Sequence, residues 1–194
     1  MRIAGSAGFT LPETLLALSL GGVILLAAAQ LYPLLRSQSQ SSAHYFRLEQ
    51  LFNQVAFSME KDIRRAGFCA GSRCAGRALF IGQAEGEAAH SCFIASWDLN
   101  RNGAWEANDH SEPETFGYRL RRQALEVQRG VGHCQGNRWE KLLDPQEVAV
   151  TALRIQALGH QSGGTLYELH IAGHWAKKPA VRRSLRWLMR GRNQ

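Results

Sequence analysis

The sequence predicts an α+β protein in which one long N-terminal helix packs on an antiparallel β-sheet. An apolar run over residues 14–35 is followed by an amphipathic helical pattern over residues 48–63. After residue 77, strand-like runs alternate with turn signals, and no further helical pattern separates them. Strands that follow one helix without intervening helices are typical of an antiparallel sheet with the helix on one face.

The first helical segment is long enough to cross a membrane. Residues 14–35 would form a helix of about 33 Å, at about 1.5 Å rise per residue. Glu13 stands at the N-terminal edge of this segment and is the only charged residue between positions 2 and 36. Because a charge there is costly, it usually has a partner. We expect this partner to be the α-amino group of Phe9, created by cleavage of the chain after Gly8.

The second helical segment carries an apolar stripe that we expect to lie on the sheet. Its members recur at steps of three and four residues: Leu48, Leu51, Phe52, Val55, Met59 and Ile63. The polar residues 36–42 are interpreted as helix that continues into water. Gly67, which follows two arginines, is a typical residue for the end of a helix.

Seven strands are expected in the rest of the chain. They cover residues 78–82, 91–97, 116–122, 124–129, 148–158, 166–175 and 184–189. Residues 118–121 and 125–128 alternate between apolar and polar side chains, as half-buried strands do. The sequence Gln161-Ser162-Gly163-Gly164 predicts a hairpin turn between two long strands.

All four cysteines follow the apolar segment: Cys69, Cys74, Cys92 and Cys134. A positively charged N-terminus that stays inside would place this part of the chain outside the cytoplasm. In an oxidising compartment an even number of cysteines indicates disulfides, and four cysteines allow three pairings. We favour Cys69 with Cys74 and Cys92 with Cys134, because the first pair closes a short glycine-rich loop.

The formal net charge of +7 comes from the C-terminal end, because residues 176–194 contain seven basic residues and no acidic one. The rest of the chain therefore sums to zero. The candidates for binding an anion, nucleic acid included, are Lys177, Lys178, Arg182, Arg183 and Arg186. A solvated basic edge is the alternative, and we favour it.

Residues 98–109 have the spacing of a calcium-binding loop. Oxygen-bearing side chains stand at its first, third, fifth, ninth and twelfth positions, and Gly103 stands at the sixth. The candidate ligands are Asp98, Asn100, Asn102, Ala104, Glu106 and Asp109. Asp109 is shorter than the usual Glu, and no helix pair flanks the loop. A turn held by its own Asx side chains is an equally good interpretation.

We do not expect an enzyme. Ser, His and Asp residues are present, but none stands in a nucleophile elbow, and no phosphate-binding glycine loop follows a strand. Calcium is therefore the only cofactor for which the sequence gives a candidate site.

The N-terminus resembles the class III signal of type IV pilins and type II secretion pseudopilins. The resemblance lies in Gly8-Phe9-Thr10-Leu11-Pro12-Glu13, in the short leader before it and in the apolar helix after it. It implies that a prepilin peptidase cuts after Gly8 and methylates Phe9. It also implies that Glu13, the fifth mature residue, neutralises the terminal amine of a neighbouring subunit. A conventional signal peptide cut near Ala29, or a plain membrane anchor, would leave Glu13 unexplained.

The resemblance continues beyond the anchor. Residues 61–68 resemble the helix end of minor pilins of the J/W type. Residues 97–106, the four cysteines and residues 116–134 resemble the enterobacterial group called prepilin peptidase-dependent protein B. The implied organisation is pilin-like, with a leader (1–8), a transmembrane and filament-core helix (9–35), its amphipathic continuation (36–66) and a periplasmic domain with a basic tail (67–194).

The function implied by this resemblance is that of a minor pilin in the bacterial inner membrane. Such a protein helps to initiate or cap a type IV pilus or a type II secretion pseudopilus, together with other minor and major pilins. The alternative is a DNA-binding minor pilin of a DNA-uptake filament, which would bind phosphates through the basic C-terminal residues.

Overall fold

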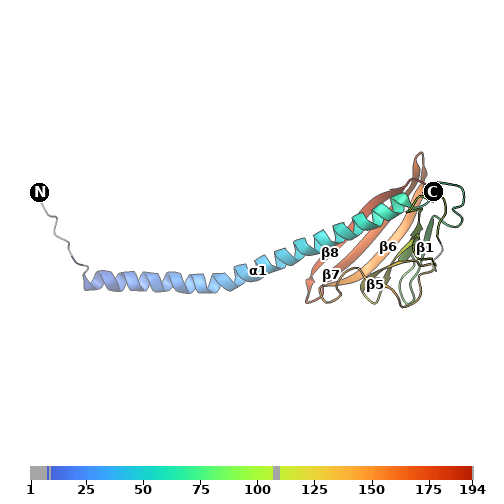
Figure 1. The fold of residues 1–194 in the computed structure, drawn as a ribbon. Coiled ribbons are helices and arrows are strands. Elements are labelled where there is room, and N and C mark those ends of the chain that lie inside the picture. The colour runs from blue at the N-terminus through green and yellow to red at the C-terminus, as the bar shows by residue number, and fades with distance from the viewer. Residues whose placement is uncertain (1–7, 9, 107–109, 194) are drawn as a thin grey trace, which may run out of the picture. The chain divides into compact units, whose positions relative to one another are not determined.

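The computed structural model describes the chain except for residues 1–7, 9, 107–109 and 194. It confirms an α+β fold with one long helix and antiparallel strands (Figure 1). Two compact units are present, residues 1–43 and residues 44–194. The helix α1 (Leu11–Arg65) supplies most of the first unit and the first element of the second.

The N-terminal unit is an apolar helix whose large side chains lie exposed. They include Leu15, Leu16, Leu18, Leu20, Val23, Ile24, Leu25 and Leu26. Among the described residues, α1 is the one helix that is long and apolar enough to cross a membrane. This part of the chain therefore fits a single-pass membrane anchor.

The C-terminal unit contains two antiparallel sheets, although the sequence suggested only one. The first sheet consists of β1 (Leu79–Gly82), β2 (Cys92–Ser96), β3 (Thr115–Arg121), β4 (Ala124–Arg129) and β5 (Glu140–Lys141). The second consists of β6 (Val148–Gln161), β7 (Gly164–Trp175) and β8 (Lys178–Gly191). In both sheets each strand pairs with its neighbour in sequence. The short strand β5 was not predicted.

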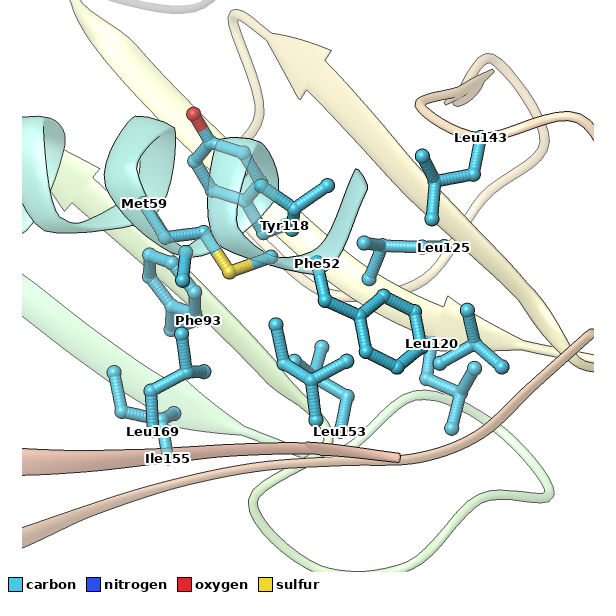
Figure 2. Close-up of a cluster of buried hydrophobic side chains, with 14 of the residues drawn as sticks. Phe52, Met59, Phe93, Tyr118, Leu120, Leu125, Leu143, Leu153, Ile155 and Leu169 are labelled. Atoms are coloured by element: carbon cyan, nitrogen blue, oxygen red, sulfur yellow. The ribbon is translucent and has the colours of Figure 1, made fainter. Parts of the chain in front are cut away.

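One hydrophobic core joins α1 to both sheets (Figure 2). From the helix, Leu48, Phe52, Met59 and Ile63 are fully buried, as the periodicity predicts. They belong to one cluster with Phe93, Tyr118, Leu120 and Leu125 of the first sheet and Leu153, Ile155 and Leu169 of the second. The amphipathic half of α1 is therefore the central element of this unit.

Gly67 ends the helix as the sequence predicts. Its φ of 88° lies in the left-handed region, which favours glycine. Its N–H donates to the carbonyl of Ser96 at 2.9 Å. A Cβ at this position would lie 2.0 Å from the carbonyl oxygen of Asn193. Only glycine fits at this junction between the helix end, β2 and the end of the chain.

The C-terminal basic segment is a strand and not a tail. Lys178–Gly191 form β8, the edge of the second sheet, whereas only residues 184–189 were expected to be extended. The side chains of Leu185, Trp187 and Met189 are buried or half-buried, and those of Arg182 and Arg186 are exposed. Arg183 hides this alternation in the sequence, because it occupies a half-buried position and pairs with Glu49 at 2.7 Å.

The structure contains the two disulfides that we favoured, Cys69–Cys74 and Cys92–Cys134. Their sequence separations are 5 and 42 residues. The longer bridge links β2 to the segment after β4. We therefore expect the two bridges to differ in their effect on stability, because a longer closed loop restricts the unfolded chain more.

Replacing Cys92 and Cys134 together by Ser should lower the free energy of unfolding by about 2–5 kcal/mol. Replacing Cys69 and Cys74 together should cost less. The measurement is urea unfolding of the full-length protein in detergent, followed by tryptophan fluorescence. The ranking would be wrong if the variant without Cys69–Cys74 were less stable than the variant without Cys92–Cys134.

Asp62 is a buried carboxyl on the core side of α1. Its Oδ2 accepts a hydrogen bond of 2.6 Å from the hydroxyl of Tyr118. Burial raises the pKa of Asp62 above its ordinary value of 3.8, and burial together with the Asp62 charge raises the pKa of Tyr118. A carboxyl whose pKa is raised by folding favours the folded state most when it is protonated. Its contribution to stability is complete below pH 3.8 and falls as the pH rises through its folded pKa.

The Asp62→Asn variant should remove this fall, because an amide keeps an acceptor for Tyr118 and has no charge to bury. We expect its melting temperature, relative to the parent, to rise between about pH 4 and pH 7. Glu85→Gln, an exposed site with the same change of charge, is the matched control and should show no such trend. If the melting temperatures of Asp62→Asn and the parent change in parallel between these pH values, burial of the Asp62 charge has no effect on stability.

Candidate functional site

The predicted processing and assembly residues lie at the start of α1. Gly8 is exposed, and among the described residues nothing lies within 4 Å of the place that a Cβ would take. Phe9 lies outside the described residues. Glu13 is exposed in the first helical turn, and its Oε2 accepts hydrogen bonds from the backbone N–H and the hydroxyl of Thr10, each at 3.3 Å.

These contacts give Glu13 a local role that we did not predict. A glutamate that reaches back from the third helical position to the N–H before the helix is one half of a capping box. An acid in the first turn also interacts favourably with the helix dipole. Both interactions are confined to the first turn of α1.

The predicted calcium loop begins with Asp98, two residues after the end of β2. Asp98 is 1% exposed, and its carboxylate accepts three backbone N–H groups. Oδ2 accepts from Ala70 at 2.9 Å and from Gly103 at 3.0 Å, and Oδ1 accepts from Asn102 at 3.1 Å. The buried charge of Asp98 therefore holds the loop closed and ties it to the Cys69–Cys74 loop.

The two asparagines of the loop form successive Asx turns. Oδ1 of Asn100 accepts from the N–H of Asn102, and Oδ1 of Asn102 accepts from the N–H of Ala104, both at 2.9 Å. Their side-chain amides donate to the carboxylate of Glu106, at 3.5 Å from Asn100 and at closer range from Asn102. Four of the predicted ligand positions, those with oxygen side chains in the described part of the loop, are thus brought together. Asp109 lies outside the described residues.

Glu114, which we did not predict, also reaches this loop from the residue before β3. It is fully buried, and its Oε1 accepts the N–H groups of Leu99 at 2.6 Å and Asn100 at 3.0 Å. Oε2 is buried and receives no hydrogen bond from the part of the chain that the structure describes. Burial and the adjacent Glu106 carboxyl raise the pKa of Glu114. The calcium-loop pattern does not predict Glu114, because the pattern covers twelve residues and Glu114 lies beyond them.

The loop is packed tightly against the short disulfide. Gly103 has a φ of 83°, and a Cβ on Gly71 would lie 2.8 Å from the Cα of Gly103. The N–H of Arg73 donates to the carbonyl of Gly103 at 3.0 Å, and the indole N–H of Trp105 donates to the carbonyl of Phe68 at 3.0 Å. Contacts with residues 68–73 therefore fix the loop, in addition to the hydrogen bonds of its own side chains.

The five basic residues predicted as an anion site do not form one patch. Arg182 and Arg186 are exposed on one face of β8, where they stand opposite His174 and His170 of β7. Arg183 faces the other way, pairs with Glu49 and lies 5.8 Å from the ring centre of Tyr45. Lys177 is exposed in the turn before β8, and Lys178 is half-buried at the start of the strand.

Comparisons with known proteins match most of this chain to one family. The family model "Prepilin peptidase-dependent protein B" matches residues 41–191, which include both sheets, both disulfides and Glu114. A curated protein of that name from Escherichia coli (strain K12) is 34% identical over 149 residues, which cover 76% of this chain and 76% of the relative. No solved structure gives a significant match. The chain belongs to the prepilin peptidase-dependent protein B family.

Proposed function

We propose that this protein is a minor pilin that helps to initiate or cap the assembly of a type IV pilus or a type II secretion pseudopilus. The observation that carries the proposal is the N-terminal half of α1. It is apolar and exposed around its surface, and a single carboxylate, Glu13, stands at its start. Membership in a family named for its dependence on prepilin peptidase supports the same function.

The exposed apolar surface gives the helix two matching environments. In the inner membrane it contacts lipid, and in a filament it contacts the same segment of neighbouring subunits. Both environments are dry, so transfer between them exposes little apolar surface to water. The domain after the anchor lies in the periplasm in this proposal, where its two disulfides persist. It acts there by contacting other pilins and not by catalysis.

Glu13 is the residue that makes this helix more than an anchor. A carboxylate in a dry environment requires a cation nearby, and the amine of Phe9 after leader cleavage supplies one. The family match starts at residue 41, so this assignment rests on the first residues of the chain and not on the comparison.

Nucleic-acid binding is a second candidate function, supported by the exposed Arg182 and Arg186 on one face of β8. It is the weaker candidate, because Arg183 faces the other way and pairs with Glu49, so it adds no positive charge to that face. In that case DNA binding would fall steeply with salt and would be lost when both exposed arginines are replaced.

Processing should leave a mature chain that begins at methylated Phe9. Intact mass of the protein extracted from membranes measures this directly. Gly8→Ala should be cleaved better than Gly8→Leu, because the peptidase must admit the residue before the cut. An N-terminus at Met1, or one near Ala29, would exclude the minor-pilin assignment.

Replacing Glu13 by Ala or by Gln should impair assembly and leave cleavage and the fold of the C-terminal unit unchanged. An unpaired charge in a membrane costs at least about 2.5 kcal/mol, so co-purification with other minor pilins should fall about tenfold or more.

The Gln variant separates the two roles of Glu13. Glutamine can still accept the hydrogen bonds from Thr10, but it cannot neutralise an amine. Thr10→Ala is the matched control, because it weakens the cap and keeps the carboxylate. If Glu13→Gln assembles as well as the parent, the charge is dispensable and the amine-pairing role is wrong.

A further inference from the structure

The loop after β2 gathers three carboxylates and two side-chain amides in one place. The carboxylates belong to Asp98, Glu106 and Glu114, and the amides to Asn100 and Asn102. Among the ion pairs formed by the described residues, none includes any of these three acids. Arg73 reaches the loop, but its guanidinium donates to the backbone carbonyl of Asn102 at 3.2 Å and not to a carboxylate.

One carboxylate oxygen of Glu114 indicates that a positively charged ligand is missing from this cluster. One of its oxygens accepts two backbone N–H groups of the loop, so the carboxyl group is fixed against the loop. The other oxygen is buried and has no hydrogen-bond donor among the described residues, although buried polar atoms are nearly always satisfied. The adjacent Glu106 carboxyl can satisfy it only through a proton shared between the two acids. A cation would satisfy this oxygen and remove the repulsion between the two carboxylates.

We propose that Asp98, Asn100, Asn102, Glu106 and Glu114 bind one Ca²⁺ ion. Carboxylate and amide oxygens are ligands of hard cations, and softer metals prefer nitrogen and sulfur. Ca²⁺ accepts six to eight oxygens in irregular arrangements, whereas Mg²⁺ requires a near-ideal octahedron and keeps several waters. Five side chains held by an irregular loop fit the coordination of Ca²⁺ better than that of Mg²⁺.

The hydrogen bonds within the loop are compatible with this ion. A carboxylate or amide oxygen has two acceptor sites, so it can accept an N–H and contact a cation at the same time. The Asx turns at Asn100 and Asn102 therefore form part of the site, and the two interpretations left open by the sequence are not exclusive. In this assignment Glu114 is the buried acid that the Asp98–Glu106 segment lacks. Asp109 is not required.

The test is calcium binding by the full-length protein in detergent after treatment with a chelator. Titration calorimetry with CaCl₂ should show one ion per chain, with a dissociation constant of about 10⁻⁴–10⁻³ M or tighter, as in extracellular calcium modules. Calcium should raise the melting temperature, and MgCl₂ should do so only at concentrations about tenfold higher or more.

The variants Glu114→Gln and Glu106→Gln should each weaken calcium binding about tenfold or more, because each removes one ligand charge. Glu112→Gln is the matched control, since Glu112 is exposed two residues before Glu114, and it should bind like the parent. Circular dichroism without calcium verifies that each variant is folded. If Glu114→Gln does not fold, the half-exposed Glu106 decides the question.

A folded parent without a calcium-dependent heat or melting shift would overturn the proposal. Binding to Glu114→Gln or Glu106→Gln as tight as to the parent would overturn it as well. The proposal does not depend on the proposed assembly function. Glu13→Gln should bind calcium normally, so failure of one proposal is distinguishable from failure of the other.

Discussion

The C-terminal unit depends on the burial of one face of α1. No strand pairing joins the two sheets within the described part of the chain. Side chains of the helix, among them Phe52 and Met59, belong to the one cluster that includes residues from both sheets. Full burial of each such side chain contributes about 1.5–3 kcal/mol. β6 also contacts β2, β3 and β4 directly, so the helix completes a core that the two sheets share.

The two halves of the same helix require opposite surroundings. The half that begins at Leu48 has a polar face and an apolar face, so its own domain can bury the apolar one. Residues 14–35 are apolar on all sides, and no single domain face can cover such a helix. A bilayer or a bundle of like helices can. This difference in pattern is the physical basis for assigning anchoring and assembly to the first half and folding to the second.

Local and periodic features could be predicted from the sequence, and non-local ones could not. Steps of three and four residues placed the buried stripe of α1, and alternation placed β3 and β4 within a residue. The length of β8 was underestimated, because the inward position of Arg183 is explained only by Glu49, far away in sequence. The break between the sheets has no periodic signal. Glu114 was missed for a similar reason, since its role depends on a loop that folds back over it.

The end of α1, the short disulfide and the acidic loop meet at one junction. The carbonyl of Phe68 accepts the N–H of Asp98 and the indole N–H of Trp105, both at 3.0 Å. Asp98 in turn accepts the N–H of Ala70, inside the Cys69–Cys74 loop. These bonds connect the loop that begins at Asp98 to the segment that follows α1. Glu13 belongs to the other compact unit, at the opposite end of the helix. The proposed ion site and the proposed charge pair therefore belong to different compact units, so a variant of one of them tests only one of the two proposals.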